Sequence, residues 1–176
     1  MKGKINLRNQ MNQKTTIIVT IIAITIIGIT TVYTLNNIKP NNGVQEAHSL
    51  HFSISKITQD GPQGNQIYYI KNMNTANIMI RAEKYSTNGV EIYIVNGIQK
   101  KAWREIAGEW QDLSDTFTVE LETWKATIEE HKETLSNWSG TGEYTYTDSD
   151  GVEIEIYDIK INLSIADSIF DPAIVI

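Results

Sequence analysis

Hydrophobic and polar residues alternate along the second half of the chain. In residues 76–85, Ile78 and Ile80 fall on one side, and Arg81 and Glu83 fall on the other. Successive side chains of a strand point to opposite faces, so this pattern predicts a strand with one face buried and one face in water. Similar strand patterns are found in four other segments: 48–57, 66–71, 90–95 and 152–157. The period of two predicts an antiparallel sheet.

Turn dipeptides separate the predicted strands. Asn88-Gly89, Asn96-Gly97 and Asp150-Gly151 stand between alternating segments. Asn-Gly and Asp-Gly fit the positive φ angles of tight hairpin turns. We therefore expect sequential strands to be joined as a meander of seven or eight strands.

Residues 114–138 follow a different period. Their apolar side chains recur every three or four positions, or seven, as one stripe of a helix: Phe117, Leu121, Trp124, Ile128, Leu135 and Trp138. Ser114 or Asp115 can cap the start of this helix, and Gly140 stands near its end. The opposite face is acidic and is expected to be solvated. The fold class predicted is α+β, a curved antiparallel sheet covered by one long amphipathic helix.

Residues 17–35 form an apolar run without a charged residue, which matches the length of a transmembrane helix. Four of the 15 Lys and Arg residues precede this run, and no Asp or Glu does. The part of the chain after the run therefore contains all 21 Asp and Glu and 11 Lys and Arg, which gives it a net charge of about −10. The basic flank predicts a cytoplasmic N-terminus and an extracytoplasmic C-terminal domain. A cleaved signal peptide is the alternative, but no small-x-small cleavage site follows the run.

Four segments are therefore expected. A cytoplasmic basic tail (1–16) leads into a single-pass anchor in the cell membrane (17–35), a polar linker (36–46) and one extracytoplasmic domain (47–176). The anchor contains no ionisable residue, so it is expected to act as a tether. About 130 residues are enough for one domain with a hydrophobic core.

Composition and motifs give little support to catalysis. The chain has no cysteine, which excludes disulfides and thiol chemistry. The acidic domain argues against nucleic acid, which requires a basic surface. His48 and His51 would point to opposite faces of a strand, so they make a poor metal pair. Asp148–Glu153 is too short for a calcium loop and is better explained as a hairpin turn. We expect a non-enzymatic protein without a metal or cofactor.

The order of elements resembles the superfamily of lipoprotein carriers and lipid-binding lipoproteins represented by LolA, LolB and LppX. The similarity spans residues 48–172: the strand series IYYIKNMNTANIMIRAEKY and NGVEIYIVNG, the Trp-bearing segment KKAWREIAGEWQDLS, the helix, the hairpin EYTYTDSDGVEIEIYDIKINLSI, and the ending from Ala166 to Pro172. The resemblance implies a half-barrel that encloses an apolar cavity for acyl chains. The expected lining residues are Ile78, Ile80, Ile92, Ile94, Trp103, Phe117, Leu121, Trp124 and Ile128.

The favoured function is a membrane-anchored, extracytoplasmic protein that binds a lipid or the acyl chain of a lipoprotein. Its tryptophans also have a plain explanation as core residues, since aromatic side chains bury large areas. One alternative is a structural surface protein such as a pilin-like subunit, although residues 14–35 contain no Glu. Another is a sensor or interaction domain that contacts a protein partner through a sheet edge.

Overall fold

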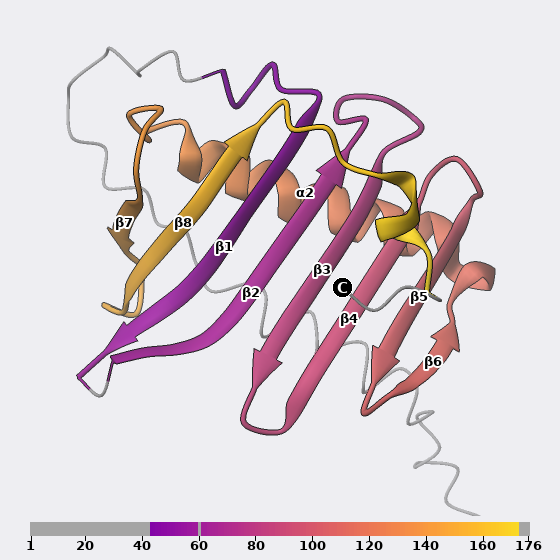
Figure 1. Ribbon diagram of the computed structural model, residues 1–176, viewed down its shortest axis with the longest axis horizontal. Helices are drawn as coiled ribbons and strands as arrows, with labels where there is room; N and C mark the ends of the chain where they lie inside the picture. Colours follow the sequence, from indigo (N-terminus) through magenta and orange to yellow (C-terminus); the bar gives the residue numbers. More distant parts are fainter. Residues whose placement is uncertain (1–42, 60, 173–176) are drawn as a thin grey trace, which may run out of the picture.

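The computed structural model describes residues 43–59 and 61–172, which form one open antiparallel sheet and one long helix. The sheet is eight-stranded, with the order β6-β5-β4-β3-β2-β1-β8-β7 (Figure 1). Its strands are β1 (Ser49–Thr58), β2 (Gly61–Lys71), β3 (Met79–Ser86), β4 (Gly89–Asn96), β5 (Lys101–Ile106), β6 (Glu109–Asp112), β7 (Tyr144–Thr147) and β8 (Glu153–Ile161). The α+β class and the antiparallel sheet are confirmed.

Helix α2 (Phe117–Leu135) carries the chain from one edge of the sheet to the other. It follows a short 3-10 turn, η1 (Ser114–Thr116), and runs across the strands on one face of the sheet (Figure 1). The predicted stripe is confirmed as the buried side of the helix, with Leu121, Trp124, Ile128 and Leu135 in the main core. The helix is shorter than predicted at both ends, and Trp138 packs into the core from beyond its C-terminus.

The opposite face of the sheet is also covered, at β3 and β4. The chain after β8 folds back and places the 3-10 turn η2 (Asp167–Phe170) against these two strands (Figure 1). Five buried residues form a second core here: Met79, Ile92, Ile94, Ile165 and Phe170. The prediction that one face of these strands lies in water is therefore wrong, because Ile165 and Phe170 cover it.

Arg81 and Glu83 lie on this second face and form a buried ion pair. They are 1% and 4% exposed, and Arg81 Nε donates to Glu83 Oε1 over 2.7 Å. Arg81 Nη1 also donates to the carbonyl of Ile169 at 3.1 Å, while the Tyr85 hydroxyl donates to Glu83 Oε2 at 2.6 Å. The bond to Glu83 and burial together raise the pKa of Tyr85 to about 12. A polar pair can stay buried here because each charge is hydrogen-bonded.

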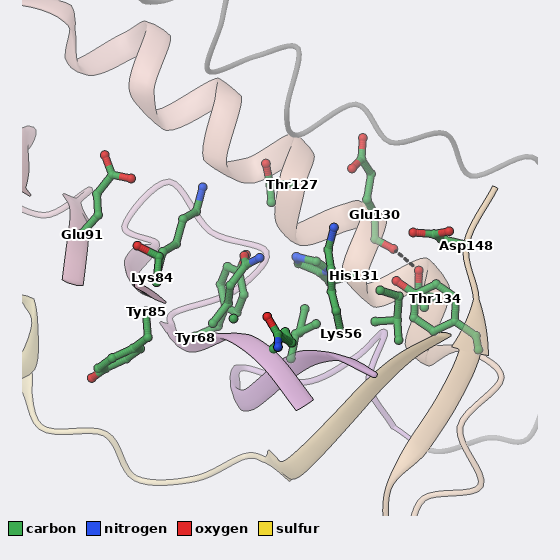
Figure 2. Close-up of a pocket in the computed structure, with 17 residues that line it drawn as sticks. Lys56, Tyr68, Lys84, Tyr85, Glu91, Thr127, Glu130, His131, Thr134 and Asp148 are labelled. Carbon is green, nitrogen blue, oxygen red and sulfur yellow. Dashed lines mark hydrogen bonds between the residues drawn. The ribbon is translucent and has the colours of Figure 1, made fainter. Parts of the chain in front are cut away.

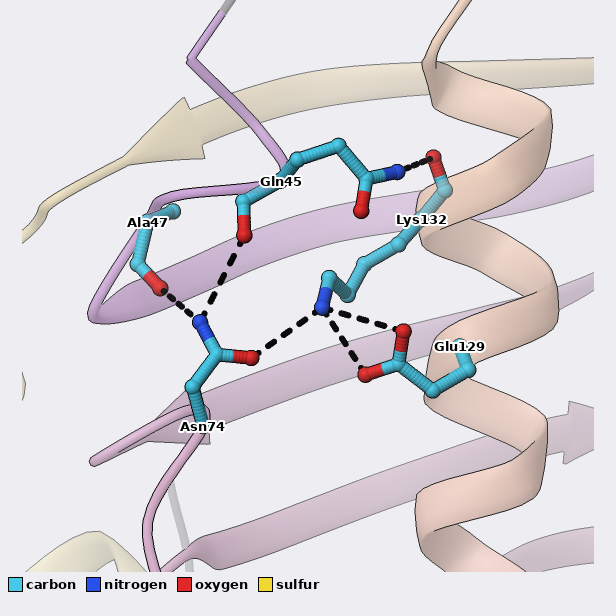
Figure 3. A network of polar contacts seen from close by, with 5 residues as sticks. All are labelled: Gln45, Ala47, Asn74, Glu129 and Lys132. Atoms are coloured by element: carbon cyan, nitrogen blue, oxygen red, sulfur yellow. Dashed lines mark hydrogen bonds and ion pairs between the residues drawn. The ribbon is translucent and has the colours of Figure 1, made fainter.

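A second buried cation fixes the helix against the start of the domain (Figure 3). Lys132 is 3% exposed, and its Nζ bonds Asn74 Oδ1 at 3.2 Å and Glu129 Oε1 at 2.8 Å. Gln45 Nε2 donates to the Lys132 carbonyl at 3.1 Å. Asn74 Nδ2 in turn donates to the carbonyls of Gln45 and Ala47 at 3.4 and 3.5 Å. The first described residues are thus attached to the C-terminal half of α2.

All three predicted turn dipeptides stand at turns between consecutive antiparallel strands, and the glycines of two of them have positive φ angles. Gly89 and Gly151 have φ angles of 118° and 79°, as such turns require. Gly97 has a different role, because its backbone passes close to residues 76–78. A Cβ at Gly97 would lie 2.5 Å from the Ile78 carbonyl oxygen, and its N–H donates to the same oxygen at 2.9 Å. Glycine is needed there for a close approach of two backbones.

Candidate functional site

A cavity of about 420 Å³ lies between the C-terminal half of α2 and the sheet (Figure 2). The helix contributes Thr127, Glu130, His131 and Thr134 to its walls. The sheet contributes apolar and aromatic side chains from β1, β2, β7 and β8: Ile54, Tyr68, Tyr146 and Ile154. The volume lies within the range of about 300–1,000 Å³ typical of small-molecule sites.

The register of the strands brings the apolar floor of the cavity together. Tyr146 pairs with Ile154 across β7 and β8, and Ile154 pairs with Lys56 across β8 and β1. On the neighbouring strand, Tyr68 is 2% exposed and its hydroxyl donates to Gln66 Oε1 at 2.8 Å. Burial raises the pKa of Tyr68, so its hydroxyl stays neutral in the physiological range.

His131 lines the cavity and carries an unpartnered ring nitrogen. Its ring meets the edges of Phe52 and Tyr68, with centroids 5.2 and 5.0 Å apart. Nε2 is buried and has no hydrogen-bond partner among the described residues. Burial, with a smaller contribution from the charge of Lys84, lowers the pKa of His131 to about 4. The imidazole is therefore neutral at neutral pH and can donate or accept one hydrogen bond at Nε2, depending on its tautomer.

The depressed pKa of His131 predicts a loss of stability in acid. As the pH falls from 6.5 to 4, the unfolded chain takes up a proton at His131 that the folded domain does not, so the free energy of unfolding falls. Each pKa unit is worth about 1.4 kcal/mol, so the loss is on the order of 2–3 kcal/mol. Above the unfolded pKa both states are neutral and the contribution vanishes.

Urea unfolding of the His131→Gln variant across this pH range measures the effect. The variant should lose less stability on acidification than the wild type. His48→Gln is the matched control, because the His48 side chain is exposed and should leave the pH profile unchanged. Equal profiles for the wild type and His131→Gln would contradict the burial of a neutral imidazole.

Two lysines, Lys56 and Lys84, line the cavity. Lys84 lies opposite Glu91 in the β3–β4 register, and the charge of Glu91 partly offsets the effect of burial on the pKa of Lys84. Lys84 Nζ lies 5.4 Å from the Tyr93 ring centroid and 5.7 Å from that of Trp124. Burial is the main cause that lowers the pKa of Lys84. Lys56 is exposed at the other side of the cavity. Within residues 43–59 and 61–172, neither lysine makes an ion pair with an Asp or Glu.

Two of the carboxylates at the cavity wall are already engaged. Glu91 Oε1 accepts from Arg104 Nε at 2.6 Å and from the Tyr93 hydroxyl at 2.8 Å. Asp148 Oδ1 accepts from the backbone N–H groups of residues 150 and 152 at 2.9 and 2.8 Å, which closes the β7–β8 turn. These two acids therefore already have hydrogen-bond donors of their own.

The nine residues expected to line one cavity do not share one space. Six belong to the main core or pack against it under α2: Ile78, Ile80, Phe117, Leu121, Trp124 and Ile128. The other three, Ile92, Ile94 and Trp103, lie on the opposite face in or against the second core. The reason is the strand register, since Ile94 pairs with Arg81 whereas Ile80 pairs with Val95. None of the nine lines the cavity of about 420 Å³.

The residues that line the cavity from α2 had a signal in the sequence. Thr127, His131 and Thr134 are spaced by four and three positions, so they form a second, more polar stripe beside the apolar one. No function was predicted for this stripe. The two lysines carried no such signal, because strand alternation does not tell which cations a helix will cover.

The described part of the chain holds no group of three or more His, Asp or Glu residues that could bind a metal ion. Of the helices in residues 43–59 and 61–172, none has the length and apolar character that a membrane span needs. The predicted anchor, residues 17–35, and the basic tail lie outside the described residues. No family model, curated protein or solved structure matches the chain. Its function is therefore inferred from the cavity under α2.

Proposed function

We propose that this protein is a membrane-anchored, extracytoplasmic binding protein that holds a lipid-like, amphipathic small molecule in the cavity under α2. The observation that carries the proposal is the cavity of about 420 Å³ with an apolar floor and the unpartnered Nε2 of His131 in its wall. A site of this kind is mostly apolar and uses a few polar groups to orient its ligand.

The distribution of side chains supports an amphipathic ligand. Ile54, Ile154 and the Tyr146 ring offer apolar surface on the sheet side. Polar groups stand around them, including the amines of Lys56 and Lys84. A purely polar ligand would leave the apolar floor wet, and a purely apolar one would leave His131 Nε2 buried without a partner, which costs about 1–3 kcal/mol.

The proposal assigns no reaction to the site. A nucleophile or general base is normally hydrogen-bonded to a second catalytic group that activates or orients it. Among the described residues His131 Nε2 has no such partner, and the Tyr68 hydroxyl is engaged with Gln66 and kept neutral by burial. These features suit binding better than catalysis.

The proposal includes the predicted membrane anchor as well as the domain that the structure describes. Gln45, near the first described residue, bonds the Lys132 carbonyl on the helix that roofs the cavity. A transmembrane anchor at residues 17–35 would then join the domain beside α2, close to the source of a membrane ligand. We propose that the ligand enters a curved half-barrel like that of the LolA-like carriers.

Filling the cavity tests the proposal. Thr134→Trp places a large side chain at the cavity wall from a half-buried helix position, and it should abolish ligand binding. Thr123→Trp is the matched control, because it makes the same change on the same helix at an exposed position outside the cavity. Native mass spectrometry of full-length protein purified from membranes should detect a co-purified lipid in the wild type and the control, and none in Thr134→Trp.

Two outcomes would contradict the proposal. If the wild type carries no lipid and takes up no added amphiphile, the cavity is not a lipid-binding site. If Thr134→Trp binds as well as the wild type while both are folded, the ligand occupies another part of the protein.

A further inference from the structure

We propose that the ligand of this cavity carries an oxyanion, a carboxylate or a phosphate, that binds between Lys56 and Lys84 and accepts a hydrogen bond from His131 Nε2. This inference rests on the proposed function and names the chemical class of the ligand. It excludes neutral lipids, such as acylglycerols, as the preferred occupant.

The first argument is that neither lysine forms an ion pair within the described part of the chain. The chain as a whole has a net charge of −6, so acidic side chains are abundant. Even so, Lys56 and Lys84 form no ion pair with the described residues, whereas Lys71, Lys132 and Lys160 each do. Glu91 lies opposite Lys84 across β3 and β4, but its carboxylate also accepts from Arg104. The two lysines of the cavity can therefore attract an anion from outside.

The second argument is the arrangement of the polar groups (Figure 2). In this view the amines of Lys56 and Lys84 both extend toward α2, and the His131 ring lies between them. The carboxylate of Glu130 points away from the ring, while Glu91 and Asp148 are engaged by Arg104 and by backbone N–H groups. We therefore assign the two ammonium groups and the imidazole nitrogen to the ligand.

The third argument is the state of His131. A neutral imidazole with its proton on Nε2 donates one hydrogen bond, and an oxyanion is the strongest neutral-pH acceptor for it. The low pKa of His131, which Lys84 helps to depress, means that the ring adds no third positive charge to the empty cavity. The apolar tail of the same ligand would then lie over Ile54 and Ile154.

Binding of matched probes to the full-length chain in zwitterionic nanodiscs tests the inference. Decanoate and methyl decanoate share one alkyl chain and differ in charge, decyl phosphate replaces the head group, and acetate lacks the tail. Charge-assisted hydrogen bonds should make decanoate bind about tenfold or more tightly than its methyl ester. The tighter of decanoate and decyl phosphate indicates whether a fatty acid or a phospholipid-type head group is the source.

A double variant assigns the effect to the two lysines. Lys56→Gln/Lys84→Gln should weaken decanoate about tenfold and leave methyl decanoate unchanged. The matched control is Lys100→Gln/Lys125→Gln, which removes the same charge outside the cavity. For the wild type, added salt should weaken decanoate and spare the ester, and this readout does not depend on the folding of a variant.

The outcomes separate the two proposals. Equal affinities for decanoate and its ester, with no effect of the double variant, would overturn the oxyanion inference and leave the proposed function intact. No binding of either amphiphile would overturn the proposed function, and the inference with it. Acetate that binds as tightly as decanoate would support the oxyanion site but contradict a lipid-like ligand.

Discussion

Replacing Arg81 with methionine is expected to destabilise the domain by about 3–5 kcal/mol, the range for breaking a buried ion pair by removing one partner. Arg81 is 1% exposed and bonds both Glu83 and the Ile169 carbonyl. Without the guanidinium, the Glu83 carboxylate is left buried beside Ile92, where it still accepts a hydrogen bond from the Tyr85 hydroxyl. A carboxylate in that environment must be protonated or exposed by local unfolding.

Chemical denaturation of Arg81→Met against the wild type measures this loss. The double variant Arg81→Met/Glu83→Gln should recover much of it, because it removes the uncompensated charge and keeps an acceptor for Tyr85. Lys125→Met is the surface control: its partner Glu122 is 67% exposed, and loss of such a pair costs about 0–1 kcal/mol. If Arg81→Met behaves like Lys125→Met, the pair is not buried under the C-terminal segment.

Replacing Phe170 with alanine should cost about 3–5 kcal/mol, the usual range for a buried Phe. Phe170 is 1% exposed and packs in the second core with Met79, Ile92 and Ile94. Its removal opens a cavity on the face that η2 covers and loosens the segment that accepts the Arg81 bond at Ile169. The loss should therefore be coupled to that of Arg81→Met, since both act on one contact between β3 and η2.

Thermal unfolding of Phe170→Ala, with Ile98→Ala as control, tests this prediction. Ile98 is 55% exposed, so its truncation should change the free energy of unfolding by less than about 0.5 kcal/mol. Hydrogen exchange should also become faster at the amides of β3 and β4 in Phe170→Ala. Additive losses for Phe170→Ala and Arg81→Met would contradict the coupling of the two sites through η2.

Helix α2 combines two roles along its length. Its apolar stripe, with Leu121, Trp124 and Ile128, fills the core over the middle of the sheet. The C-terminal half adds a second stripe, with His131 and Thr134, that faces the cavity instead. His131 is accommodated there as a neutral imidazole, with its ring packed edge-on against Phe52 and Tyr68. The proposed binding site adjoins the core, and a ligand in it would occupy the place that protein side chains occupy in the rest of the core.

Local patterns in the sequence were sufficient for the fold class, for the helix and for most of the strands. Strands β5 and β6 were not among the segments predicted as strands. The alternation around Ile80 and the stripe through Trp124 set the period of each element, because each depends only on residues near in the chain. The same patterns also indicated an apolar run at residues 17–35, and its role as an anchor stays a prediction. The pairs Asn88-Gly89 and Asp150-Gly151 marked two tight turns from local backbone preference alone.

The tertiary structure decided which faces are covered and where a cavity remains. The sequence pattern predicts that Arg81 and Glu83 lie on a solvated face. In the structure, residues 165–170, which are distant in the chain, cover this face. Register decided that Ile94 shares a face with Arg81 while Ile80 lies under α2. The cavity, too, depends on helix and strands that meet only in the folded domain. These properties are long-range. A local period indicates which side chains share a face of an element, but the packing of segments distant in the chain determines what that face contacts.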